Sequence, residues 1–323
     1  MALLFTDIQG FVGSILVSAL KEHHSIYGLD IVPLEREGVL KTYSWNELEL
    51  LPAVDTIIHL ADKVHETNPP DHIHSEYFDI NTELTKTIFD YFLQSNAKQF
   101  IFFSSVKAAA DRVEGDYLTE DVVSKSIDPY GDSKIAAEKY IWSKGKRYTI
   151  HGSPHLEARG WGKDKRVYIF RPCMINGLDK KEDLNLLYKF VNKGIPYPFG
   201  AFDNKRSFLN IENLTYIVEK FILQNPPSGI YHLADDEAIS TNELIELIAQ
   251  SKCKKAKILH LNKVFIKVIA KIGDYTRLHV NSDRLKKLTE NYVVSNRKMK
   301  HALRIERLPF DVKEGLIKTL KTF

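Results

Sequence analysis

Two segments of the chain carry side chains whose types and spacing could move a proton. Tyr130 and Lys134 are four residues apart, so on a helix they would lie one above the other on the same face. The positive charge of a neighbouring lysine favours the tyrosinate and lowers the pKa of the phenol below its free value of about 10. Ser105 follows an apolar run, and its hydroxyl could hold the oxygen of an alcohol or ketone. Together these residues predict proton transfer at a carbinol oxygen while a hydride leaves or joins the carbon.

The first thirty residues predict a dinucleotide-binding turn. An apolar run at residues 2–6 is followed by Gly10 and Gly13 and then by helical apolar spacing up to Leu20, which gives the order strand, glycine turn and helix. Such glycines let the backbone approach a pyrophosphate at the N-terminus of a helix. A second strand ends on Asp30, about 20 residues beyond the glycines, where a carboxylate hydrogen-bonds the adenine ribose. An acid at that place would repel a 2′-phosphate, so we expect NAD rather than NADP.

Apolar runs without alternation predict buried parallel strands at residues 55–61, 98–103 and 167–170. Helical patterns separate these runs, so we expect an α/β fold with a doubly wound, Rossmann-like parallel sheet. Residues 1–170 form the predicted NAD-binding domain. The pattern of elements changes from Arg171 onward, so residues 171–323 form a second, smaller C-terminal region.

Composition excludes several classes of protein. The 323 residues are 44% hydrophobic and 27% charged, with a net charge of +3, which gives no argument for nucleic acid or a membrane as partner. Cys173 and Cys253 form no disulfide framework, and neither a signal peptide nor a transmembrane run is recognised, so we expect a cytoplasmic protein. The histidines show no metal-ligand spacing. A basic group is interpreted as a solvated face; it consists of Lys252, Lys254, Lys255, Lys257 and Lys263.

Several motifs together resemble one family. They are the glycine turn with Asp30, Ile57-Ile58-His59-Leu60-Ala61, Asp79-Ile80-Asn81-Thr82, Phe102-Phe103-Ser104-Ser105, the Tyr130–Lys134 segment and Arg171-Pro172. On these residues the chain resembles the extended short-chain dehydrogenase/reductases of the NAD-dependent epimerase/dehydratase family, which act on nucleotide sugars. Within that family it is most similar to bacterial surface-polysaccharide enzymes that act at C4 of UDP-linked N-acetyl sugars. Markers of that subgroup are His65, Ser104-Ser105-Val106-Lys107, residues 194–198 and residues 204–208.

The resemblance implies that residues 207–235 or so complete the NAD-binding domain and that residues 171–323 form the substrate region, with the site in the cleft between the two. It also implies a role for each matching residue. Ser105, Tyr130 and Lys134 would be catalytic, with Lys134 also holding the nicotinamide ribose and Ser104 lining the nicotinamide pocket. The residues assigned to NAD are Gly10, Phe11, Val12, Gly13, Asp30, Ile31, Leu60, Ala61, Asn81, Ser104, Tyr130, Lys134 and Pro172. The residues assigned to the nucleotide sugar are His65, Ser105, Asn185, Tyr197 and Arg206, with Phe199 as a further candidate. Arg206 would bind the substrate pyrophosphate, and His65 would either touch the sugar or cap a loop. The protein could also form a homodimer.

The sequence departs from the family pattern in four places. Asp7 stands where the first glycine of the fingerprint is expected, and a carboxylate so near a pyrophosphate should weaken cofactor binding unless it points away. Asp62 stands at a position that is usually small, and Met174 replaces an asparagine. Residues 144–166 are longer than the usual connection and rich in glycine, so we expect an exposed loop.

Three functions remain open at the level of sequence. We favour reduction of a UDP-linked 4-keto sugar for polysaccharide precursors, with 4-epimerisation by tightly bound NAD as the alternative. A 4,6-dehydratase is disfavoured because Val106 and Lys107 stand where that reaction needs an acid pair. A function of another class is a non-catalytic dinucleotide-binding regulator, which Asp7 and Asp62 would suit and the intact Ser105, Tyr130 and Lys134 oppose.

Overall fold

The predicted parallel sheet is present. A computed structural model describes residues 1–63, 73–126, 128–149, 157–161, 164–177, 185–276 and 282–322. Its main sheet has seven strands in the order β11-β8-β5-β4-β1-β2-β3, and every neighbouring pair is parallel. The strands are β1 (Ala2–Thr6), β2 (Ser25–Asp30), β3 (Lys41–Ser44), β4 (Thr56–His59), β5 (Gln99–Phe103), β8 (Arg166–Pro172) and β11 (Gly229–Leu233). This is the order of a doubly wound fold, in which ligands bind beyond the carboxyl ends of the strands.

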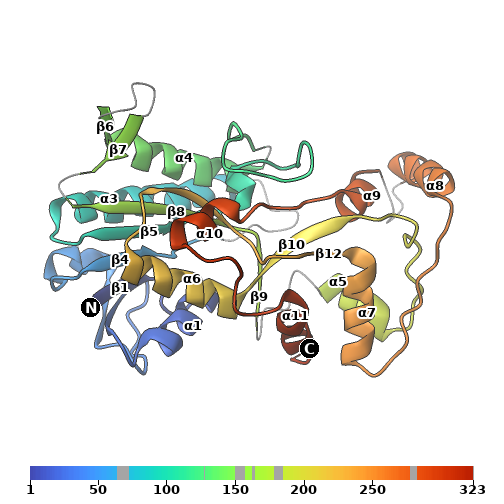
Figure 1. Cartoon of the computed structure of the whole chain (residues 1–323), viewed down its shortest axis with the longest axis horizontal. Helices are drawn as coiled ribbons and strands as arrows, with labels where there is room; N and C mark the ends of the chain where they lie inside the picture. Colours follow the sequence, from blue (N-terminus) through green and yellow to red (C-terminus); the bar gives the residue numbers. More distant parts are fainter. Residues whose placement is uncertain are drawn as a thin grey trace.

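Helices cover both faces of this sheet, and this is why its central strands are apolar throughout. Helices α3 (Leu84–Gln94) and α4 (Pro129–Lys144) lie on one face, and α1 (Phe11–Leu20) and α6 (Ile211–Gln224) on the other (Figure 1). All five residues of β5 are buried. A strand with helices above and below has no solvent side, so it shows no alternation of polar residues.

The helix before α3 does not run regularly. It begins as α2 (Ile73–Phe78), passes through a π-helical turn at Asp79–Glu83 and then continues as α3. The wider turn carries the predicted motif residue Asn81, whose side chain is buried. π-Helical turns are rare and are frequent at functional sites.

A smaller unit follows the sixth strand of the main sheet. Its three-stranded sheet has the order β12-β10-β9, formed by β9 (Met174–Asn176), β10 (Lys205–Asn210) and β12 (Ala238–Ser240). Its helices are α5 (Asn185–Asn192), α7 (Thr241–Ser251), α8 (Lys263–Thr276), α9 (Ser282–Thr289) and α11 (Val312–Leu320). A capping box begins α7, where Ser240 and Glu243 satisfy each other's backbone amides. Helix α10 (Arg297–Leu303) returns to the main sheet and packs against α6 and β11.

The expected exposed loop at residues 144–166 is wrong where the structure describes it. Strands β6 (Lys146–Thr149) and β7 (Glu157–Gly160) form an antiparallel hairpin above α4 (Figure 1). Trp161 follows the hairpin and is buried, with its indole NH donating to the carbonyl of Ile141 at 2.9 Å. Its ring also packs on Trp142 of α4, with centroids 5.3 Å apart. Glycines suggested a loop, but aromatic packing on α4 holds this end of the segment in place.

Candidate active site

Helix α4 positions the predicted tyrosine and lysine. Asp128 caps the helix by accepting from the amide of Gly131 at 2.8 Å, and Pro129 occupies its first turn. Tyr130 and Lys134 therefore lie one turn apart on the face that packs toward the carboxyl end of β5. The Lys134 side chain is fully buried, and its ammonium donates to the carbonyl of Phe103, the last residue of β5, at 3.0 Å.

Ser105 joins this pair from the turn after β5. It begins a short 3-10 helix, η3 (Val106–Ala108), and its hydroxyl accepts from the amide of Lys107 at 3.2 Å. A hydrogen bond also links Ser105 to the Tyr130 phenol. The structure thus brings together the three side chains that the sequence assigns to chemistry.

Asp62 makes a contact in this group that the sequence did not predict. Its carboxylate accepts from the Tyr130 hydroxyl at 3.2 Å and lies 3.0 Å from the Lys134 ammonium. Burial raises the pKa of Tyr130 well above its usual value, and the Asp62 charge adds to the rise, while the Ser105 hydrogen bond opposes it. The expectation that the pKa of this phenol lies below its free value is therefore wrong for this arrangement. Asp62 pairs with the lysine charge and stabilises the neutral phenol.

Asp62 owes its position to a buried polar network at the end of β4. Thr6 accepts from the amides of Leu60 and Ala61, both at 2.9 Å, just before Asp62. The ring of His59 bonds to Thr6 and to Thr85, both at 2.8 Å. Burial lowers the pKa of His59 to about 3, so the ring is neutral and structural. The family marker at His59 thus fixes the backbone that presents Leu60, Ala61 and Asp62.

Asn81 ties the π-helical turn to the same region. Its side-chain oxygen accepts from the amide of Lys63 at 2.7 Å, and its amide group donates to Ser133 of α4 at 3.0 Å. Asn81 therefore links the segment that carries Asp62 to the helix that carries Tyr130. In this arrangement its side chain is already engaged with protein groups.

Ser104 does not join the group around Tyr130. Its hydroxyl donates to Glu138 at 2.5 Å, and Glu138 also pairs with the buried Arg171 at 2.5 Å. Successive residues of an extended segment point to opposite sides, so Ser104 and Ser105 diverge. The Glu138–Arg171 pair was not predicted, because a glutamate within a helix gives no sign that it is buried.

The glycine turn has most features that a dinucleotide requires. Gly10 caps α1, where Phe11 and Val12 are the first helical residues. A side chain at Gly13 would meet the backbone oxygen of Asp7 at 2.3 Å, so the close approach there requires glycine. Asp30 ends β2, beside the turn, and accepts from the amide of Ile31 at 2.7 Å and from that of Gln9 at 3.4 Å. Pro172 lies at the end of β8, at the same edge of the sheet.

Asp7 is the feature of this turn that opposes an anion. Its backbone is left-handed, with φ of 53°, and its carboxylate lies over Gly10, where an added Cβ would meet it at 2.1 Å. Burial raises the pKa of Asp7 to about 7, and the charges of Asp30 and Asp62 add to the rise. Lys134 acts in the opposite direction. The residues fit NAD when this carboxyl group is protonated or turned aside.

The candidate substrate residues lie on the smaller unit. Arg206 is on β10, half-buried, and its charge interacts with Tyr197. Tyr197 is buried and packs edge-on against Phe199 at 5.4 Å, so both rings belong to a core cluster. Asn185 is the first residue of α5, and His65 lies outside the described residues.

Tyr292 connects the two sides and was missed at the level of sequence. Its hydroxyl donates to the carbonyl of Ala110 at 2.7 Å, just beyond Ser105 and η3. Its backbone also pairs with Arg206. The segment that supports Arg206 is therefore linked directly to the segment that carries Ser105.

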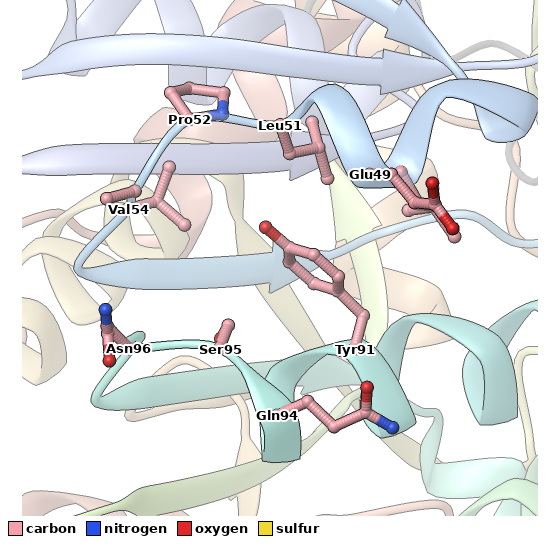
Figure 2. A pocket seen from close by; sticks show the side chains of 10 residues that line it. Glu49, Leu51, Pro52, Val54, Tyr91, Gln94, Ser95 and Asn96 are labelled. Carbon is pink, nitrogen blue, oxygen red and sulfur yellow. The ribbon is translucent and has the colours of Figure 1, made fainter.

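A pocket seen in Figure 2 lies at the other end of the sheet. It is lined by residues 48, 49 and 51–54, which precede β4, and by Tyr91 and residues 94–96 at the end of α3. These residues are at the amino ends of the strands, whereas Tyr130, Lys134 and Asp30 are at the carboxyl ends. None of the candidate site residues lines this pocket.

Fold and site together define a dinucleotide-dependent enzyme of the extended short-chain dehydrogenase type. The model of the NAD dependent epimerase/dehydratase family matches residues 4–234, and the chain belongs to this family. NAD is the cofactor of the family.

Individual relatives share a quarter or so of their residues with the chain, or fewer. The chain is 27% identical over 270 residues to a UDP-glucose 4-epimerase of Vibrio cholerae, covering 77% of this chain and 75% of that protein. It is 25% identical over 215 residues to the N-acetyl-alpha-D-glucosaminyl-diphospho-ditrans,octacis-undecaprenol 4-epimerase of Escherichia coli O157:H7, covering 66% and 59%. The structure of MoeE5 in complex with UDP-glucose and NAD superposes with a TM-score of 0.72 at 18% identity, covering 100% and 98%.

Asp7 should make the cofactor-free protein less stable as pH rises from about 4 to 7. The unfolded carboxyl group ionises near 3.8 and the folded one near 7, so in this window only the unfolded state loses the proton. Asp7→Asn cannot ionise and should be more stable than the wild type at pH 8 by about 1–3 kcal/mol, allowing for partial exposure. Urea unfolding at pH 4 and pH 8 measures the difference.

The comparison needs two controls. Asp116→Asn changes an exposed carboxylate and should leave the pH dependence of stability as in the wild type. Burial also raises the pKa of Asp235 to about 7, but this contribution is common to all variants and cancels. An Asp7→Asn protein with the wild-type pH dependence would contradict the assignment.

Proposed function

We propose that the chain catalyses NAD-dependent 4-epimerisation of a UDP-linked hexose or N-acetylhexosamine. The observation that carries this proposal is the convergence of Ser105, Tyr130 and Lys134 at the carboxyl end of β5, beside the glycine turn and Asp30. Two relatives, one acting on UDP-glucose and one on a lipid-linked diphospho sugar, are named as 4-epimerases. Both names describe a reaction of the relative at C4 of a sugar that is linked through a diphosphate.

The cofactor would lie across the carboxyl end of the main sheet. Gly10, Gly13 and the first turn of α1 would receive the pyrophosphate, since the amides of a helix N-terminus bind anions. Asp30 would accept from the hydroxyls of the adenine ribose, and Lys134 would reach the ribose beside the nicotinamide. Bound NAD would supply a hydride acceptor and donor. Residues of the protein would position the sugar and transfer the proton.

Tyr130 would exchange a proton with the oxygen at C4 of the sugar. Ser105 would hold that oxygen through its hydroxyl, in line with the phenol with which it already shares a hydrogen bond. Lys134 would stabilise the tyrosinate whenever it forms, because a nearby cation favours the charged phenol. For this the Lys134 charge has to act on Tyr130 rather than on Asp62, which lies 3.0 Å from it in this arrangement.

One observation favours the second candidate, reduction of a UDP-linked 4-keto sugar. Asp62 accepts from the Tyr130 hydroxyl and raises the pKa of that phenol, so Tyr130 is held as a proton donor. Ketone reduction begins with a donor, because the carbonyl oxygen takes up a proton as the hydride from NADH reaches the carbon. Epimerisation begins with proton removal from a hydroxyl. The same three residues serve both reactions, which differ in whether NADH is consumed.

Arg206 would bind the diphosphate of the substrate. Arginine is permanently charged and can donate two parallel hydrogen bonds to a phosphate. A diphosphate is common to UDP-sugars and to the lipid-linked sugars of the relative from Escherichia coli, so Arg206 by itself does not distinguish them. Tyr197 and Phe199 belong to a core cluster and would support Arg206 from behind rather than cover the nucleotide.

One incubation separates the candidates. The purified protein is supplied with UDP-glucose, UDP-N-acetylglucosamine or the 4-keto-6-deoxy derivative of the latter, each with and without NADH. An epimerase converts the first two to their C4 epimers without net change in absorbance at 340 nm. A reductase consumes NADH only when the 4-keto sugar is supplied. A non-catalytic regulator converts none of the three sugars.

Tyr130→Phe should lower turnover by about 10²–10⁴, the usual contribution of general acid/base catalysis. The ring stays and the transferable proton is lost, so NAD affinity measured by calorimetry should change little. Tyr140→Phe is the matched control, because Tyr140 lies on the same helix and also donates to a carboxylate, that of Asp90 at 2.6 Å. If Tyr130→Phe retained near-full activity, the three residues would not form a catalytic unit.

Arg206→Ala should weaken UDP binding by about 1.5–3 kcal/mol, the range for a hydrogen bond to a charged group. Isothermal titration of UDP into the NAD-loaded protein measures this, and the thermal midpoint checks that the fold survives. Lys205→Ala, at the neighbouring exposed position of the same strand, is the control and should bind UDP as the wild type does. Equal affinity in both variants would remove Arg206 from the site.

Asp30 should make the protein bind NAD at least about tenfold more tightly than NADP, because its carboxylate and the 2′-phosphate carry like charges. Calorimetric titration of the cofactor-free protein with each dinucleotide tests the ratio. Asp30→Asn should narrow it, and the exposed Asp116→Asn should not. Tighter binding of NADP by the wild type would mean that a basic neighbour such as Arg36 dominates this end of the site.

A further inference from the structure

Helix α8 turns an apolar face to solvent. Val264, Phe265, Val268, Ile269 and Ile272 are between 36% and 69% exposed. At about 100° per residue these five side chains occupy one continuous arc of the helix. The arc is centred near Ile272, on the side facing away from the residues that attach the helix to the protein. Isolated exposed apolar residues are ordinary, but a continuous apolar face usually marks an interaction site.

Helix α8 is packed against the protein on its other side, so its exposed face does not reflect a detached helix. Ile266 and Ala270 are buried on the opposite side of α8. They join a core cluster with Ile245 of α7, Leu285 of α9 and the candidate-site residues Tyr197 and Phe199. Figure 1 shows α8 at the end of the molecule farthest from the main sheet. The helix is therefore anchored by a narrow apolar stripe and presents a second, wider one outward.

A row of lysines borders the apolar arc. Lys263, Lys267 and Lys271 are exposed and four residues apart, so they line one flank of the helix between its buried and its exposed apolar sides. Residues 252–276 hold seven lysines and a single acid, Asp274. The whole chain has a net charge of +3, so the rest of it is net negative. Positive charge is thus concentrated on and just before the helix with the exposed apolar face.

We propose that α8 docks this protein onto an anionic membrane surface, with its apolar face in the boundary between headgroups and acyl chains. A helix with an apolar face and a lysine-rich flank is suited to lie in the plane of that boundary. The apolar face contributes insertion, and the lysine row is attracted to acidic lipids. Docking of this kind is peripheral. Among the residues described, no helix is long and apolar enough to cross a bilayer.

The charge pattern favours a membrane over other occupants. A second copy of this chain would bring two lysine rows together, and like charges oppose such a contact. Nucleic acid would use the lysines but would leave the apolar arc exposed to water. An acidic bilayer complements both features. The lysine-rich segment, interpreted from the sequence as a solvated face, becomes part of this docking surface.

The docking helix is connected to the substrate side of the protein. The segment just before α8 forms backbone bridges with the substrate side, between Ile258 and Tyr197 and between His260 and Phe199. Tyr197 in turn interacts with Arg206, the residue proposed to bind the diphosphate. Docking would therefore hold the substrate-binding unit, rather than the far edge of the NAD-binding sheet, next to the lipid. The proposal itself does not depend on which sugar is epimerised or reduced.

Sedimentation with vesicles tests the proposal on the full chain. The wild type should bind vesicles that contain phosphatidylglycerol and bind pure phosphatidylcholine at least about tenfold less, with the difference shrinking in high salt. Lys263→Gln/Lys267→Gln/Lys271→Gln should lose about 100-fold in affinity for the acidic vesicles. Val264→Ser/Phe265→Ser/Val268→Ser should lose binding to both kinds of vesicle by about tenfold or more.

The matched control changes exposed apolar residues elsewhere. Leu40→Ser/Val123→Ser/Leu223→Ser replaces side chains that are 65%, 91% and 59% exposed and should bind vesicles as the wild type does. Circular dichroism and the thermal midpoint verify that each variant is folded. A wild type that fails to bind acidic vesicles at low salt overturns the proposal.

Two further outcomes would also contradict it. If the α8 variant and the control variant lost binding equally, the contact would not be specific to α8. If analytical ultracentrifugation showed a wild-type dimer that the Val264, Phe265 and Val268 substitutions dissociate, without vesicle binding, the face would belong to a second copy. None of these results bears on the C4 chemistry, which is measured in the absence of vesicles.

Discussion

The Lys134 ammonium is the charge on which the arrangement of this site depends. It is fully buried, and a buried cation is stable only with close acceptors. Its acceptors come from two places: the carbonyl of Phe103 at the end of β5 and the carboxylate of Asp62 after β4. Helix α4 is thereby fixed to two neighbouring strands of the sheet. Tyr130, one turn earlier, and Ser105, two residues after Phe103, are held in contact by the same connection.

Asp62 limits how far the Lys134 charge can stabilise a tyrosinate at Tyr130. A lysine that interacts with a carboxylate does less to stabilise a tyrosinate, and a tyrosine that donates to the same carboxylate remains neutral. The proposed catalysis needs Lys134 to act on Tyr130, so a ligand in the site has to compete with Asp62 for both groups. In the structure Tyr130 is therefore held as a neutral phenol that donates to Asp62.

The neighbouring carboxylates extend the same pattern to the glycine turn. The charges of Asp30 and Asp62 both act on Asp7, and Lys134 is the cation that opposes them there. Burial raises the pKa of Asp7 to about 7, and the two neighbouring acids add to the rise because like charges disfavour ionisation. The dinucleotide-binding fingerprint has glycine at this position, which would leave only backbone amides facing a pyrophosphate. In this chain the same amides remain, and a titratable group lies beside them.

Sequence alone determined the elements whose signals are local. Continuous apolar runs predicted the central parallel strands, because a strand covered on both faces has no polar side. The four-residue spacing predicted that Tyr130 and Lys134 share a helix face, and the distance from the glycines predicted that Asp30 ends β2. Tertiary structure alone decided which partners these residues meet. Asp62 reaches Lys134 from 72 positions away, and Glu138 binds Arg171 and the hydroxyl of Ser104 inside the core. Such pairings depend on how strands and helices pack across the sheet, and no local pattern of residues encodes which buried charge will find which partner.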